Sequence, residues 1–204
     1  MGELGLSLAA VWAVLDRATA RPARGAAPGR GAHGTLRLLY WQAPTILNPN
    51  LAGGTKDSHG SRVVLEPLFT ADAAGTLSPV LAAQVPTRQN GGLAADGRSV
   101  TFRLKQGVRR ADGRPFTSDD VIFTHHFAAN RQTGATSYAS YENVAKVEPL
   151  NASSVKVSFK DPTPFWFRGF VGASGAILPR HRTVRLRRFW ARPTGPLRAT
   201  CGIS

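Results

Sequence analysis

Residues 96–123 read DGRSVTFRLKQGVRRADGRPFTSDDVIF, and this stretch decides the fold. Its central part, residues 99–108, alternates between apolar and polar side chains, which predicts a strand with one buried face. The residues expected on the buried face are Val100, Phe102 and Leu104. Asp96 and Gly97 come directly before the strand. They predict a hairpin turn that pairs it with the stretch before Gly91.

Three aspartates follow the strand within nine positions, and they could form a catalytic site, a metal site or part of the architecture. Asp112 and Gly113 have the composition of a tight turn. Thr117 has the features of a helix cap, and Asp120 stands where its carboxylate can reach back to that cap. Asp119 and Asp120 also lie where the helix dipole favours negative charge. The three aspartates are therefore predicted to be scaffold.

Other patterns that carry chemistry are missing from the sequence. Neighbouring residues on a helix diverge by roughly 100°, so Asp119 and Asp120 cannot face a substrate together. His125 and His126 also point apart, which predicts one partly buried and one solvated histidine. Residues 172–175 (GASG) only half resemble a nucleophile elbow. The sequence thus predicts no catalytic residue, no metal site and no cofactor, and so no enzyme.

Further elements are expected on both sides of this stretch. Residues 36–41 (LRLLYW) are apolar and aromatic, which predicts a buried strand. Residues 61–68 are expected to be helical, with Asp57 or Ser58 as the cap. Residues 144–160 contain two runs of strand-forming residues around a turn, which predicts a second hairpin. The chain is therefore expected to be rich in antiparallel strands, with a few helices.

The charge of the 204 residues is +14, and it is unevenly distributed. Residues 1–33 hold four arginines and two acidic residues, and residues 34–181 hold sixteen basic and ten acidic residues. Residues 182–204 hold six arginines and no acidic residue. With 42% hydrophobic residues the middle segment can bury a core and is expected to be the folded part. Only the tail is basic enough to suggest a nucleic-acid or membrane partner.

The N-terminal segment admits two interpretations. Residues 4–15 form an apolar run of signal-peptide length, and residues 18–20 (ATA) offer a cleavage pattern. No Lys or Arg precedes the run, and Asp16 follows it directly, so an amphipathic or artefactual leader is the alternative. Residues 21–32 are rich in Gly, Ala, Pro and Arg, as in a flexible linker. Cys201 is the single cysteine, so an internal disulfide is excluded, and no apolar run reaches membrane-spanning length.

The order of these segments resembles the family 5 solute-binding proteins of bacterial ABC importers, the dipeptide- and oligopeptide-binding group. Four segments carry the resemblance: LRLLYWQAPTILNPN at 36–50, EPLFTADAAGTLSPVLAAQVP at 66–86, ADGRSVTFRLKQGVRRADGRPFTSDDVIFT at 95–124 and VKVSFKDPTPFWF at 155–167. The third is the most specific, because an extended pattern fits residues 96–123 almost throughout. The resemblance covers about residues 34–181.

The resemblance implies an α/β fold with mixed sheets (α+β), of the periplasmic-binding-protein-like type II. It implies an exported, periplasmic, monomeric receptor that closes two lobes over a peptide or other small solute. Such a receptor delivers its solute to an ABC permease complex in the inner membrane, without catalysis, cofactor or nucleic acid. The resemblance places ligand contacts in the loop after the first strand and in the sequence SYASY. These residues are Trp41, Gln42, Ala43, Thr45, Tyr138 and Tyr141.

Two features depart from the family. Its members are usually more than twice as long, so the second lobe is expected to be missing here. After His181 the family continues its first lobe, whereas residues 182–204 lose acidic residues and periodicity. This predicts a frameshifted or truncated product, a fragment. A genuine basic tail that binds nucleic acid or an anionic membrane is the alternative. One wall of a two-lobe clamp is expected to fold poorly and to bind peptide weakly or not at all.

Overall fold

A computed structural model describes residues 38–183 of the chain. The chain divides into two units, residues 1–40 and 41–204, and the fold below is that of the second unit. The predictions made for the leader and linker (residues 1–33) lie outside the described residues. The same holds for the basic tail from residue 184 onward.

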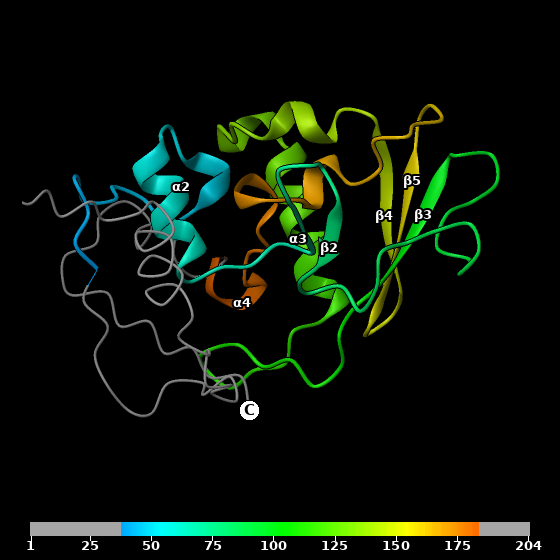
Figure 1. The fold of residues 1–204 in the computed structure, drawn as a ribbon, viewed down its shortest axis with the longest axis horizontal. Coiled ribbons are helices and arrows are strands. Elements are labelled where there is room, and N and C mark those ends of the chain that lie inside the picture. The colour runs from blue at the N-terminus through cyan, green and yellow to red at the C-terminus, as the bar shows by residue number, and fades with distance from the viewer. Residues whose placement is uncertain (1–37, 184–204) are drawn as a thin grey trace, which may run out of the picture. The chain divides into compact units, whose positions relative to one another are not determined.

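Three antiparallel strands form the main sheet (Figure 1). They are β3 (Ser99–Arg103), β4 (Val144–Asn151) and β5 (Ser154–Phe159), in the order β3-β5-β4. Phe102 pairs with Val155, and Val147 pairs with Val157. The hairpin predicted over residues 144–160 is therefore confirmed, with β5 at the centre of the sheet.

The alternation predicted over residues 99–108 is confirmed as far as Leu104, and the strand itself ends at Arg103. Every second side chain from Val100 to Leu104 is buried, while Arg103 is exposed. The turn at Asp96 and Gly97 is present, and Gly97 adopts φ +67°, a conformation that favours glycine. Next to this turn the strand pairs with residues 92–94. Farther along, Arg103 and Leu104 pair with residues 82 and 83, so the predicted pairing with the stretch before Gly91 is confirmed at that end of the strand.

A second, two-stranded ribbon lies beside the sheet and shares its core. It consists of β1 (Phe69–Ala71) and β2 (Leu77–Pro79), joined by a turn at Asp72–Gly75. Aromatic rings join the ribbon to the sheet: the ring centres of Phe69 and Phe102 lie 5.5 Å apart. The same cluster includes Trp166, Phe170 and Tyr141. Such edge-to-face pairs stabilise the core beyond the area that they bury.

Helix α3 (Ser118–Ala129) packs against the sheet (Figure 1). Its start is the predicted capping box, in which the Asp120 carboxylate accepts a hydrogen bond from the backbone of Thr117 at 3.2 Å. Val121 lies in the main core, and Asn130 is the C-cap residue of the helix. The capping box, which is a local sequence signal, thus starts the helix that packs against the sheet.

Two predicted elements are wrong. The strand predicted over residues 36–41 is absent from its described part, because residues 38–41 are exposed and in no strand; residues 36 and 37 lie outside the described residues. Helix α2 spans Thr55–Arg62, so it ends where the helix predicted over residues 61–68 begins. The Asp57 carboxylate bonds to Thr45 and Ile46 and caps no helix end. The remaining helical pieces are η1 (Pro49–Leu51), η2 (Arg131–Thr133), η3 (Tyr138–Tyr141), η4 (Arg168–Phe170), η5 (Ala173–Gly175) and α4 (Arg180–Thr183).

Candidate functional site

The loop that was predicted to contact ligand is exposed at its start. Trp41 is 72% exposed, and Gln42 and Ala43 are exposed as well. An indole and an amide on an open loop can stack on a flat group and exchange hydrogen bonds with a peptide backbone. This part of the structure is therefore compatible with the predicted contacts.

Thr45 has a different role at the other end of the loop. Its backbone amide donates to Asp57 Oδ1 at 2.6 Å, and its hydroxyl lies 3.0 Å from both carboxylate oxygens. Asp57 is buried and also accepts from the amide of Ile46 at 3.3 Å and from Lys56 at 3.2 Å. Burial alone would raise the pKa of Asp57, but these hydrogen bonds together hold it below its ordinary value. Thr45 thus anchors the loop to α2.

The two tyrosines of SYASY differ in exposure. Tyr138 is partly exposed, and the guanidinium of Arg131 lies 4.6 Å from its ring centre. Arg131 also pairs weakly with Glu142, at 3.9 Å. A cation on one face of the ring favours a rigid orientation of Tyr138. Tyr138 therefore remains available as a predicted contact.

Tyr141 belongs to the core of the structure. It is only 2% exposed, and its hydroxyl donates to the backbone oxygen of Gly169. Burial raises the pKa of this hydroxyl above its ordinary value. A Cβ added at Gly169 would lie 2.4 Å from the ring, so the glycine makes room for the tyrosine. Its ring and hydroxyl are both occupied, so Tyr141 is buried among core residues in this structure.

The two predicted ligand segments meet at Asn50, a residue that no motif in the sequence indicated. The backbone amide of Thr136 donates to the carbonyl oxygen of Asn50 at 2.7 Å. The Ser137 hydroxyl donates to Asn50 Oδ1 at 2.6 Å. Asn48, Asn50 and Ser137 are all buried. In the sequence, two asparagines flank Pro49, but nothing in this local pattern indicates that their side chains are buried.

The three aspartates singled out in the sequence act as scaffold. Asp112 lies in a turn with Gly113 at φ +81° and pairs with His181 Nε2 at 2.5 Å. Asp120 pairs with Arg110 at 2.8 Å and accepts from the backbone of Arg180 at 3.0 Å.

Asp119 lies on the surface and pairs with the Arg180 side chain at 2.7 Å. Together with Asp112 and Asp120, it fastens residues 180–181 to the start of α3, which the sequence did not indicate.

The two histidines of α3 match their prediction. His125 is 8% exposed, and His126 is exposed. Both ring nitrogens of His125 lack a hydrogen-bond partner among the described residues, and its ring lies 5.6 Å from that of Tyr141. Burial, with a smaller contribution from His126, lowers the pKa of His125 to about 4. His125 is therefore neutral at physiological pH.

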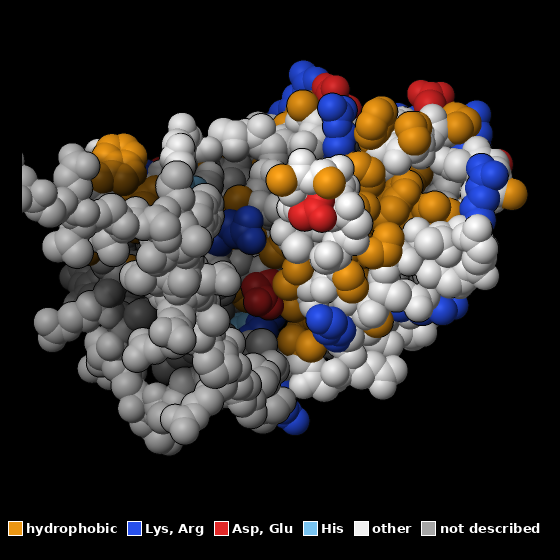
Figure 2. Space-filling model, viewed as in Figure 1, with side chains coloured by type: hydrophobic (Ala, Val, Ile, Leu, Met, Phe, Trp, Pro, Cys, Tyr) orange, Lys and Arg blue, Asp and Glu red, His pale blue; other side chains and the backbone are white. Residues whose placement is uncertain are grey.

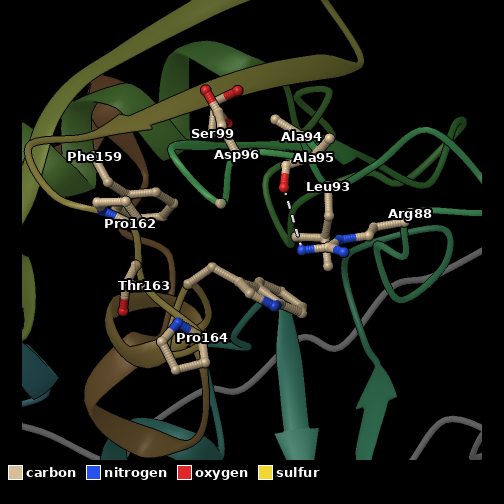
Figure 3. A pocket seen from close by; sticks show the side chains of 12 residues that line it. Arg88, Leu93, Ala94, Ala95, Asp96, Ser99, Phe159, Pro162, Thr163 and Pro164 are labelled. Carbon is tan, nitrogen blue, oxygen red and sulfur yellow. Dashed lines mark hydrogen bonds between the residues drawn. The ribbon is translucent and has the colours of Figure 1, made fainter.

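A surface pocket of about 440 Å³ lies away from the predicted ligand residues. Figure 3 shows the side chains of Leu93, Phe159, Pro162 and Pro164 around it, with Arg88 at one side. Arg88 donates to the backbone oxygen of Ala95 at 3.2 Å. Figure 2 shows exposed apolar side chains on the side of the molecule that holds the sheet. None of the six predicted contacts lines this pocket.

The described part of the chain contains neither a cluster of metal ligands nor a membrane-spanning helix. Within residues 38–183, no three His, Cys, Asp or Glu side chains gather closely enough to hold a metal ion. In the same range, none of the helices has the length and apolar character needed to cross a membrane.

Comparisons with known proteins identify the family. The model of the bacterial extracellular solute-binding proteins, family 5 Middle, matches residues 76–195. The periplasmic oligopeptide-binding protein OppA of Salmonella typhimurium is 23% identical over 164 residues, 72% of this chain and 29% of that protein. Protein XP55 of Streptomyces lividans is 31% identical over 139 residues, 68% of this chain and 23% of that protein. This chain thus spans less than a third of the length of these relatives.

Solved structures agree in fold. Haemophilus influenzae OppA, in complex with the peptide RPPGFSPFR, superposes with a TM-score of 0.63 at 24% identity. The superposition covers 74% of this chain and 31% of that one. The described residues therefore have a periplasmic-binding-protein-like fold and form part of a lobe of it. Because the family model matches more than half of its length, the chain belongs to the bacterial extracellular solute-binding proteins of family 5.

Proposed function

We propose that this chain is part of the substrate-binding component of an ABC importer that captures peptides or similar small solutes. The family match over residues 76–195 carries the proposal, because the family consists of extracellular solute-binding proteins. The relatives from Salmonella typhimurium and Escherichia coli are named as oligopeptide-binding proteins, which favours a peptide. Binding without catalysis is the proposed activity.

The proposal extends to location and partners. The same two relatives are named as periplasmic, so a periplasmic location is proposed for this chain. The partner would be an ABC permease complex in the inner membrane, with the chain acting as a monomer. A nucleic-acid or anionic-membrane function rests on the charge of residues 182–204 alone, and the family match gives it no support.

The chemistry of the exposed predicted contacts favours stacking and neutral hydrogen bonds. Trp41, Gln42 and Tyr138 supply an indole, an amide and a phenol ring, and none of them carries a charge at neutral pH. Aromatic side chains bind many peptide sequences, because they contact backbone and apolar side chains alike. A surface of this kind would accept a range of peptides.

Titration calorimetry on the purified chain tests the proposal. The probes are the nonapeptide RPPGFSPFR, the nickel–L-histidine complex and agropinic acid, each of which is bound by a protein of similar fold. We expect weak but saturable binding of the nonapeptide, because the described residues form only part of a lobe. Trp41→Ala should weaken it about tenfold, as loss of a contacting aromatic side chain does.

Phe165→Ala is the matched control, because Phe165 is another exposed aromatic residue, 57% exposed, outside the predicted site. Saturable binding of the nickel complex or agropinic acid without peptide binding would contradict the peptide preference but keep the solute-binding role. Absence of saturable binding for all three probes would overturn the proposal. Tight binding of a DNA duplex that weakens steeply with salt would then support the nucleic-acid alternative.

A further inference from the structure

A buried polar cluster joins two segments that lie far apart in the sequence. The carbonyl oxygen of Asn50 accepts from the Thr136 amide at 2.7 Å and from the Thr136 hydroxyl at 3.2 Å. Its side-chain oxygen accepts from Ser137 at 2.6 Å, across 87 positions of sequence. Asn48 orients Asn50 from its own side, since Asn48 Oδ1 accepts from the Asn50 amide at 3.0 Å. We call these contacts the Asn50 latch.

Burying the polar groups of the Asn50 latch stabilises the fold less than apolar packing of the same volume would. The side chains of Asn48, Asn50 and Ser137 are almost completely buried. Asn50 Nδ2 has no hydrogen-bond partner among the described residues, and a buried unpaired donor destabilises a fold. An apolar side chain of similar size would avoid that cost. A hydrogen bond, unlike apolar packing, fixes direction and register, so the cluster is suited to holding two segments in one geometry.

Both joined segments lead directly to exposed predicted contacts. Ser137 is the N-cap residue of η3, and Tyr138 is the first residue of that turn. On the other side, the chain runs from Asn50 back to Thr45, which Asp57 fastens to α2, and on to the exposed Trp41. The position of Tyr138 relative to the Trp41 loop therefore depends on Asn50.

We infer that Asn50 is a positioning residue for the solute-binding surface. Its latch to Thr136 and Ser137 holds Tyr138 in a fixed place relative to the loop that carries Trp41. The inference rests on the proposed function, because it takes these two aromatic residues as solute contacts. Asn50 itself is buried and acts through its neighbours.

Hydrogen–deuterium exchange on the full chain tests the latch without any ligand. Asn50→Ala and Ser137→Ala should both speed exchange in residues 41–52 and also in residues 134–141. Thr124→Val is the matched control, because Thr124 is equally buried and its hydroxyl joins α3 to residue 178 instead. In this control, faster exchange is expected around residues 120–128 and 176–180. Faster exchange of residues 49–51 alone in Asn50→Ala would overturn the inference.

Peptide affinity distinguishes a positioning role of Asn50 from a purely structural one, because a purely structural residue would not affect binding specifically. With RPPGFSPFR as the probe, Asn50→Ala or Ser137→Ala should weaken binding about tenfold. Thr124→Val should lower the melting temperature by a comparable amount but change the affinity for the peptide less than about twofold. Equal losses in all three variants would show general destabilisation and overturn the positioning role. If the unmodified chain binds no probe, the proposed function fails, and the exchange experiment alone decides whether Asn50 holds the segments.

Discussion

The sheet and the N-terminal loop region of the described chain are held by different forces. In the sheet, β3 and β5 bury Val and Phe side chains against an aromatic cluster. Between residues 41 and 64, Pro49 is the one apolar residue that is buried, and the other buried residues are Asn48, Asn50, Asp57 and Ser61. Apolar burial is strong but not directional, whereas buried hydrogen bonds add less net stability and fix position. The sheet thus supplies stability, and the loop region supplies geometry.

The largest effect is expected from the sheet. Phe102 is completely buried and its ring contacts Phe69, Trp166 and Phe170. Phe102→Ala should lower the free energy of unfolding by about 4 kcal/mol, through lost transfer energy and a cavity. Urea denaturation followed by circular dichroism measures it. The neighbouring exposed residue provides the control: Arg103→Ala should change stability by less than about 0.5 kcal/mol. Similar losses in both variants would contradict the division between the two regions.

A smaller effect is expected in the loop region. Asp57→Ala removes the acceptor for the amides of Thr45 and Ile46 and should cost about 2–3 kcal/mol. Asp72 is the matched control, because it also accepts from two backbone amides, at 2.9 and 2.8 Å, but is exposed. Asp72→Ala should cost about 1 kcal/mol or less. Denaturation of the two variants side by side provides the test, and an equal loss would show that burial of Asp57 adds nothing.

The smallest of the three effects appears as a pH dependence. The pKa of His125 falls from 6.5 to about 4 on folding, because of burial and, to a smaller extent, His126. Between these values the unfolded chain binds a proton that the folded chain does not, so acid favours unfolding. Stability from this group is complete above pH 6.5 and should have fallen by about 2 kcal/mol at pH 5. The Tyr141 ring is the other titratable group in contact with His125.

Denaturation midpoints measured from pH 7.5 to 4 check this prediction. His125→Leu should flatten the profile above pH 4, where the lowered pKa of Asp57 keeps that carboxylate ionised. His126→Gln should leave most of the slope, because His126 is exposed and only the lesser cause of the shift. A profile of the His125→Leu variant as steep as that of the unmodified chain would assign the acid sensitivity to other groups.

The sequence alone determined the elements whose signals are local. The alternation around Phe102 defines a buried face, because side chains of a strand point to opposite sides at every step. The capping box of Thr117 and Asp120 lies within four residues, and so does the turn at Gly113. The sequence also predicted that one of His125 and His126 would be partly buried and the other solvated, and in the structure His125 is the buried one. For the candidate site, the sequence and its resemblance named segments and residue types.

Only the tertiary structure decided which of those residues are available and what holds them in place. It placed Tyr141 in the core and Tyr138 near the surface, although both belong to the same short sequence. It left residues 38–41 without a paired strand, because pairing needs a neighbour that apolar composition cannot supply. The bonds of Asn50 to Thr136 and Ser137 span more than eighty positions. Contacts over such distances leave no periodic trace in the chain, so they follow from the packing of the whole fold.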